Sequence, residues 1–233
     1  MPAKIEKVAY VVIVLIILSG AYLAQFHHDF FRYTFIIEDG PLENATAVLF
    51  FITGVIMITR AVKLRKKRSK LFLLATVGAG LVMFFGAGEE ISWGQRIFGI
   101  ETPEAFAEHN KQGETNLHNL EIGDVSINKL VFSKMLAVAL VIYLLVLPIL
   151  ASKKPGVRKL TEKFGIPLPS RLQIIMWFVA LAIPELIVNS SKKGEVREVC
   201  AGIMVFVTLL TPRNRYIYDL DKDSPHPDGE ETA

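Results

Sequence analysis

Residues 8–26 have the sequence VAYVVIVLIILSGAYLAQF, which contains no charged side chain. A helix needs about 20 mostly apolar residues to cross the hydrocarbon core of a bilayer. None of the apolar runs alternates polar and apolar residues as a transmembrane barrel strand does, so each run predicts a helix. The predicted fold is all-α, a polytopic transmembrane helix bundle with six spans. The spans are expected at about 8–26, 42–62, 71–90, 130–152, 172–191 and 196–212.

The composition agrees with a membrane protein. Hydrophobic residues make up 52% of the 233 residues, whereas soluble domains have about 45–50%. The single cysteine, Cys200, excludes a disulfide framework and a cysteine-based zinc module. A signal peptide is the alternative for residues 8–26, because Lys4 and Lys7 precede them. The run is long for a signal peptide and has no good cleavage site, so we expect a span.

The distribution of Lys and Arg predicts the orientation. Of the 26 basic residues, 18 lie in the N-terminus, the second and fourth loops and the C-terminus of the six-span arrangement. Cytoplasmic loops are enriched in Lys and Arg, so both termini are expected in the cytoplasm. The basic run 64–70 is interpreted as a topology signal beside anionic lipid headgroups, with no nucleic-acid partner. Residues 1–212 are predicted to form one transmembrane domain, and 213–233 a disordered acidic cytoplasmic tail.

The third loop, expected outside the cytoplasm, is about 40 residues long. Long loops in compact proteins are usually functional or disordered. Thr102, followed by Pro and Glu, predicts the N-cap of a surface helix that ends by Gly113. Residues 113–120, GETNLHNL, predict a loop held against the bundle, with its amides bonded to backbone and its two leucines packed.

Acidic residues and histidines gather on the predicted outer face. Glu89 and Glu90 end the third span, where desolvation of a carboxylate is costly. We predict that these two residues and His118 form a catalytic site at the outer membrane boundary. Carboxylates and neutral imidazole suit zinc, manganese or iron, so a divalent metal is the candidate cofactor. The predicted metal ligands are Glu90, His118, Glu43 and Glu185, and the predicted substrate-binding residues are Arg96, Gln95, Asn116 and Asn119.

A structural alternative stays open at the same place. His118 and Asn119 would then belong to a hydrogen-bonded cap that ties the third loop to the third span. Glu43 would then be part of an N-cap arrangement at the start of the second span, where the helix dipole favours an acid. Glu185, inside the fifth span, is predicted to be buried, with a raised pKa unless it meets Arg96 or another cation.

Two strings carry a resemblance. Residues 89–96, EEISWGQR, and residues 113–119, GETNLHN, resemble those of a group of bacterial integral membrane proteins without an assigned function. The resemblance covers about residues 85–120. It implies an inner-membrane location and no particular activity.

Three function classes follow from these patterns. The first is a metal-assisted hydrolase or transferase that acts on a lipid-linked substrate. The second is an ion-coupled transporter of small solutes that uses Glu185. The third is a non-catalytic membrane assembly protein. Membrane lipids are the expected partners in each case.

The topology is testable with reporter fusions. A fusion after Ala233 should report a cytoplasmic location, and a fusion within the third loop should report the opposite side, because the basic segments stay in the cytoplasm. An extracytoplasmic signal from the C-terminal fusion would overturn the predicted orientation.

Overall fold

The computed structural model describes residues 2–37, 40–110, 113–117, 120–122, 125–126 and 134–219. These residues are mostly helical, with one hairpin of two-residue antiparallel strands. The long helices are α1 (Pro2–Phe26), α3 (Pro41–Leu64), α4 (Lys70–Glu90), α10 (Arg171–Ile187) and α11 (Lys193–Leu210). The shorter elements are α2 (His28–Phe30), η1 (Phe31–Phe35), η2 (Ser92–Gly94), α5 (Gln95–Phe98), α6 (Glu104–His109), β1 (Glu121–Ile122), β2 (Val125–Ser126), α7 (Leu136–Val141), η4 (Ile142–Val146), α8 (Leu147–Lys153), α9 (Pro155–Lys163) and η5 (Arg215–Tyr218).

Four helices are long and apolar enough to cross a membrane: α1, α3, α4 and the composite helix formed by α7, η4 and α8. The first three predicted runs are therefore confirmed as helices of sufficient length. The composite helix spans Leu136–Lys153 and includes a π-helical stretch. The predicted start of this span, residues 130–133, lies outside the described residues.

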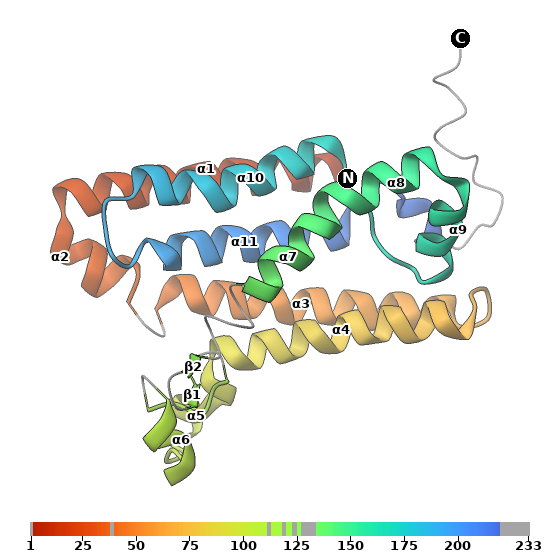
Figure 1. The fold of residues 1–233 in the computed structure, drawn as a ribbon. Helices are drawn as coiled ribbons and strands as arrows, with labels where there is room; N and C mark the ends of the chain where they lie inside the picture. Colours follow the sequence, from red (N-terminus) through yellow and green to blue (C-terminus); the bar gives the residue numbers. More distant parts are fainter. Residues whose placement is uncertain are drawn as a thin grey trace.

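The last two predicted spans are also helices (Figure 1). α10 packs against α1 and α11, and α11 also packs against α1 and α3. α10 ends at Ile187, before the predicted residue 191, because Val188 is extended (φ −84°, ψ 104°). α11 begins at Lys193 and carries four charged residues among its first six. Their apolar stretches are thus shorter than those of the other four helices.

α11 is the centre of the bundle, in contact with α1, α3 and α10. Met204 of α11 is fully buried in a core that also contains Ile13 of α1 and Trp177 of α10. A Cβ on Gly202 would lie 2.8 Å from Thr46 Cγ2, so this glycine allows α11 to approach α3 closely. α11 is therefore covered by protein, which explains why its sequence needs no long charge-free run.

α3 and α4 form an antiparallel hairpin. A Cβ on Gly80 would lie 3.2 Å from the carbonyl oxygen of Gly54, so the two glycines permit close helix contact. Ser69 caps α4 by accepting a hydrogen bond from the Phe72 amide at 3.2 Å. The hairpin places Glu89 and Glu90 at the end of α4 away from the basic turn.

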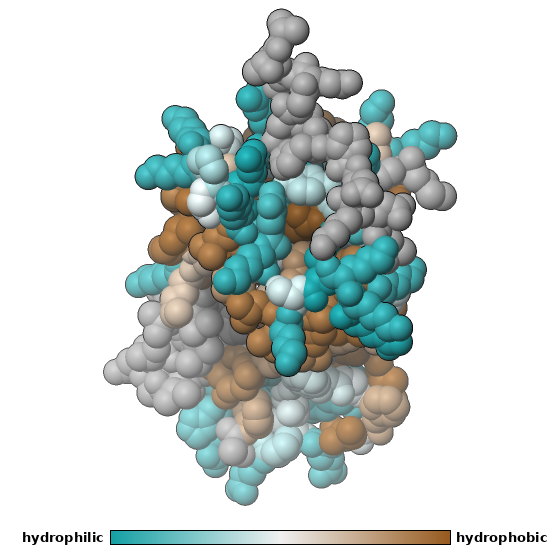
Figure 2. All heavy atoms as spheres, turned by 90° about the vertical axis from the view of Figure 1, so that its right-hand side faces the viewer, coloured by the Kyte–Doolittle hydropathy of each residue, from teal (hydrophilic) through white to brown (hydrophobic). Residues whose placement is uncertain are grey.

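The turn between α3 and α4, α9 and the C-terminal end of α11 lie toward the right of Figure 1. Figure 2 looks onto this side of the molecule, where hydrophilic side chains surround apolar ones. Arg60 of α3 donates hydrogen bonds there to the carbonyl oxygens of Leu209 and Leu210, at the last turn of α11. Its guanidinium also lies 4.6 Å from the centre of the Tyr218 ring.

The predicted boundary of the disordered tail, residue 213, is wrong because the following residues include the helix η5 and the buried side chains of Asn214 and Ile217. Asn214 is buried and accepts a hydrogen bond from the Leu168 amide at 2.7 Å. The Tyr218 hydroxyl donates to the carbonyl oxygen of Gly165 at 2.6 Å, and burial raises the pKa of Tyr218. Residues 220–233 of the predicted tail lie outside the described residues.

The Arg60 contacts are testable by substitution. Arg60→Leu should lower stability by about 1.5–3 kcal/mol, because two carbonyl groups at the end of α11 lose charged hydrogen-bond donors. Thermal unfolding in detergent measures the effect. Arg65→Leu, at an exposed position of the neighbouring turn, is the matched control. Equal melting temperatures for the two variants would contradict a structural role for Arg60.

Candidate functional site

The chain changes direction sharply just after α4. Ser92, Trp93 and Gly94 have φ values of 45°, 55° and 76°, in the region that residues other than glycine rarely adopt. The turn leads into α5 and α6, which extend away from the helix bundle beside the end of α4 (Figure 1). We call residues 91–110 and 113–117 the headpiece.

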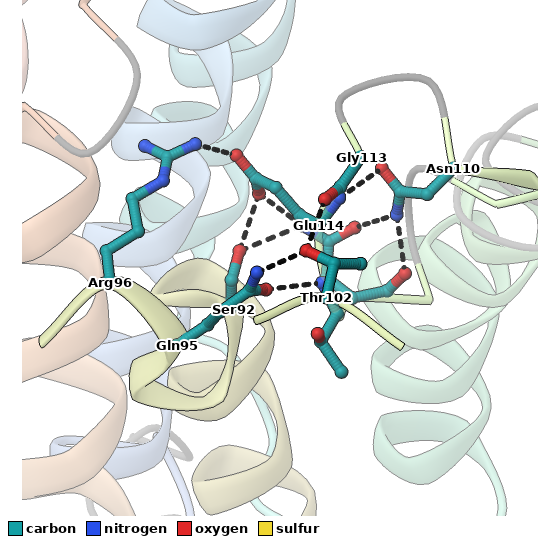
Figure 3. A network of polar contacts seen from close by, with 9 residues as sticks. Ser92, Gln95, Arg96, Thr102, Asn110, Gly113 and Glu114 are labelled. Carbon is teal, nitrogen blue, oxygen red and sulfur yellow. Dashed lines mark hydrogen bonds and ion pairs between the residues drawn. The ribbon is translucent and has the colours of Figure 1, made fainter. Parts of the chain in front are cut away.

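A buried carboxylate organises the headpiece. Glu114 Oε2 accepts hydrogen bonds from Ser92 Oγ at 2.5 Å and from Asn116 Nδ2 at 2.7 Å. Its Oε1 forms an ion pair with Arg96 (Figure 3). The side chain of Glu114 is 10% exposed, whereas that of Arg96 is 48% exposed. Both oxygens of the Glu114 carboxylate therefore have donors from within the chain.

Amides hold the headpiece loop to α5. Gln95 Oε1 accepts a hydrogen bond from the Thr115 amide at 2.8 Å, and Gln95 Nε2 donates to the Thr102 hydroxyl. Asn110 Nδ2 donates to the backbone oxygen of Asn116 at 2.9 Å. Asn110 Oδ1 accepts from the Glu114 amide at 3.2 Å. Two predicted substrate-binding residues, Gln95 and Asn116, thus bind the protein's own loop.

The surface helix is present but shorter than predicted. α6 begins at Glu104 and ends at His109, and its N-cap position is occupied by Pro103. The predicted N-cap was Thr102, which instead donates a hydrogen bond to the carbonyl oxygen of Gly113 at 2.6 Å. Thr102 therefore stabilises the headpiece loop and does not cap the helix.

Glu89 connects the headpiece to α4. Its carboxylate accepts hydrogen bonds from Trp93 Nε1 at 2.8 Å and from the Leu117 amide at 2.7 Å. The residue is 5% exposed. The prediction that the loop is held against the end of the third span is therefore correct for residues 113–117. Leu117 itself is 40% exposed, so the prediction that it packs inward is wrong.

Three of the predicted metal ligands lie outside the headpiece: Glu43 is in the first turn of α3, Glu90 is at the end of α4 and Glu185 is on α10. Glu90 is half-buried at the end of α4. Glu185 is 35% exposed and forms ion pairs with Lys193 at 3.0 Å and Arg197 at 2.7 Å. The prediction that Glu185 is buried is thus wrong, and its cations come from α11 rather than from Arg96.

The predicted metal site lies partly within the described residues. His118 and Asn119 lie outside the described residues. Across residues 2–37, 40–110, 113–117, 120–122, 125–126 and 134–219, no three His, Cys, Asp or Glu side chains come together as metal ligands would. A metal centre that includes His118 stays a prediction.

Sequence reasoning did not single out Glu114, Asn110 or Thr102 as site residues. The available signal was the density of Asn, Glu and Thr in residues 110–116, which indicated hydrogen bonding but not which residues pair. Ser92 donates a hydrogen bond to Glu114, at a position that is 2% exposed.

Comparison with known proteins identifies no relative, because no protein-family model, curated protein or solved structure matches this chain.

Glu114 is expected to stabilise the headpiece. Glu114→Gln should destabilise the headpiece locally by about 1.5–3 kcal/mol, because Ser92, Arg96 and Asn116 lose a charged acceptor. Faster protease cleavage within residues 99–113 of the detergent-solubilised protein would measure this change. Glu108→Gln, at an exposed position of α6, is the matched control. Equal cleavage rates for both variants would show that Glu114 is dispensable.

Proposed function

We propose that this chain is a multi-pass inner-membrane protein with six spans and both termini in the cytoplasm. We propose further that it is a non-catalytic assembly protein, which presents the headpiece as a rigid binding element outside the cytoplasm. The four long apolar helices establish only that the chain fits an integral membrane protein.

Charge and arrangement support the six-span topology. The basic turn between α3 and α4 and the basic helix α9 lie toward one end of the bundle, and the headpiece lies toward the other (Figure 1). α10 packs against α1, α11 packs against α1 and α3, and the two helices are 17 and 18 residues long. The positive-inside rule then assigns the basic end to the cytoplasm. The inner-membrane location rests on the resemblance of residues 85–120.

One observation carries the non-catalytic assignment. Both carboxylate oxygens of Glu89, and both of Glu114, accept hydrogen bonds from groups of the chain itself. A general base must have an oxygen within reach of the proton that it removes. These two buried acids instead act as acceptors that hold the headpiece to α4.

The surroundings of Glu185 argue against the alternative that the protein is a transporter. A proton- or ion-coupling acid inside a membrane protein usually lies in the bundle interior or in a water-filled cavity. Glu185 is about one third exposed and is neutralised by Lys193 and Arg197 of the neighbouring helix. We therefore assign Glu185 to the packing of α10 against α11.

A groove favours a second candidate, the hydrolase or transferase of a lipid-linked substrate. A cavity of about 590 Å³ opens on the side of the bundle between α1, α3 and α11. Its walls are mostly apolar and include Val8, Val12, Leu42 and Ile203, and Lys4 also lines it. Sites for small molecules have volumes of about 300–1,000 Å³, so a lipid chain fits this groove. Leu42 is next to Glu43, one of the predicted metal ligands.

Metal analysis separates the two candidates. The assembly function predicts that purified wild type, Glu90→Gln and His118→Ala have the same low metal content, because no residue then serves as a ligand. Glu101→Gln, an exposed acid of the headpiece, controls for adventitious binding. About one zinc, manganese or iron per chain, lost in both site variants and kept in the control, would overturn the assembly function. It would support the enzyme instead.

A further inference from the structure

The headpiece turns a group of large apolar side chains outward. Trp93 is 50% exposed, Ile97 69%, Phe98 73% and Ile100 57%. We call these four residues the apolar tip. They lie within eight consecutive residues, directly after the last turn of α4. Clustered exposed apolar residues of this size mark a surface that contacts another apolar phase.

Trp93 folds back along α4. Its ring lies edge-on to the ring of Phe85, with the ring centres 5.5 Å apart. It also covers Gly88, where an added Cβ would lie 2.8 Å from the indole. Phe85 is five residues before the end of α4, which corresponds to about 7.5 Å along the helix axis. The indole therefore reaches back beside the final turns of the helix.

The side of α4 that the Trp93 indole covers is apolar and exposed. Phe85 is 39% exposed, and Leu81 and Val82, one turn earlier, are 58% and 60% exposed. A helix that crosses a membrane exposes such side chains to lipid. The indole of Trp93 is thus continuous with the lipid-facing surface of α4, which argues for lipid rather than a protein as its contact.

The polar network keeps the tip from folding inward. The positive φ values of Ser92, Trp93 and Gly94 set the direction in which the chain leaves α4. Gln95 and Arg96, within the same turn, are bonded to Thr115 and Glu114. The Phe98 ring lies against Gly94, where an added Cβ would be 2.9 Å from it. Among the described residues, none covers the exposed faces of the tip, which leaves them open to contact with an apolar phase.

We propose that the apolar tip inserts into the bilayer leaflet at the Glu89 end of α4, at the boundary between headgroups and acyl chains. Trp is enriched at this boundary, and exposed Phe and Ile anchor peripheral segments there. The inference rests on the proposed function and specifies it: the headpiece binds the membrane surface beside its own bundle. The headpiece would then be fixed at a constant height above the bilayer.

Spin labelling tests the insertion. Cys200→Ala removes the single cysteine. Phe98→Cys is then added in one protein and Ile97→Cys in another, and each is spin-labelled and reconstituted into nanodiscs of phosphatidylcholine and phosphatidylglycerol. Two controls use the same background. Leu81→Cys reports the lipid-facing surface of α4, and Glu108→Cys reports an exposed polar position of α6.

Power saturation compares collisions of the label with apolar oxygen and with a water-soluble nickel complex. For Phe98→Cys and Ile97→Cys we expect an oxygen-to-nickel ratio several times that of Glu108→Cys and below that of Leu81→Cys. A ratio equal to that of Glu108→Cys would mean that the tip lies in water and would overturn the insertion. Low access to both reagents would mean protein contact and would overturn it too.

The two proposals fail separately. A water-exposed tip in a protein without bound metal overturns the insertion alone and leaves the assembly function standing. A metal bound through Glu90 and His118 overturns the assembly function whatever the labels show.

Discussion

The polar groups at the ends of apolar helices need hydrogen-bond partners, and at both ends of this molecule the chain itself supplies them. The last carbonyl groups of a helix receive no hydrogen bond from within the helix itself. At the end of α11, Arg60 reaches from α3 to the carbonyl oxygens of Leu209 and Leu210. At the end of α4, Glu89 accepts the indole N–H of Trp93 and the amide of Leu117. The first contact adds polar bonds between two helices that also pack through apolar residues, and the second ties residues 93 and 117 to the end of α4.

The helices could be predicted from the sequence because their physical requirement is local. About 20 uncharged apolar residues are enough to identify α1, α3 and α4. α11 differs, since it is buried by α1, α3 and α10 and carries charges only at its first turns. Its burial depends on Gly202 and on the helices around it, which come from distant parts of the chain. The sequence therefore located this helix but did not reveal that it is the centre of the bundle.

The site was predictable only in part, for a related reason. The sequence indicated that the 113–117 loop is held to the end of α4, because Asn and Glu side chains without solvent must form hydrogen bonds. It did not indicate which groups pair. Glu114 bonds to Ser92, 22 residues away, across a turn whose positive φ values occur at a serine and a tryptophan. No glycine marks those two positions, so composition offered no signal for the turn.

The same turn explains why a tryptophan occupies a position that favours glycine. A residue other than glycine held at positive φ costs about 1–3 kcal/mol, and glycine would adopt this conformation more readily. Glycine at position 93 would, however, leave Glu89 without its indole donor and Gly88 uncovered. The hydrogen bonds of Glu114, Gln95 and Asn110 offset the strain. The buried polar network and the exposed apolar tip are therefore two parts of one arrangement. The network stabilises the strained turn, and this turn places the Trp93 indole against the lipid-facing surface of α4.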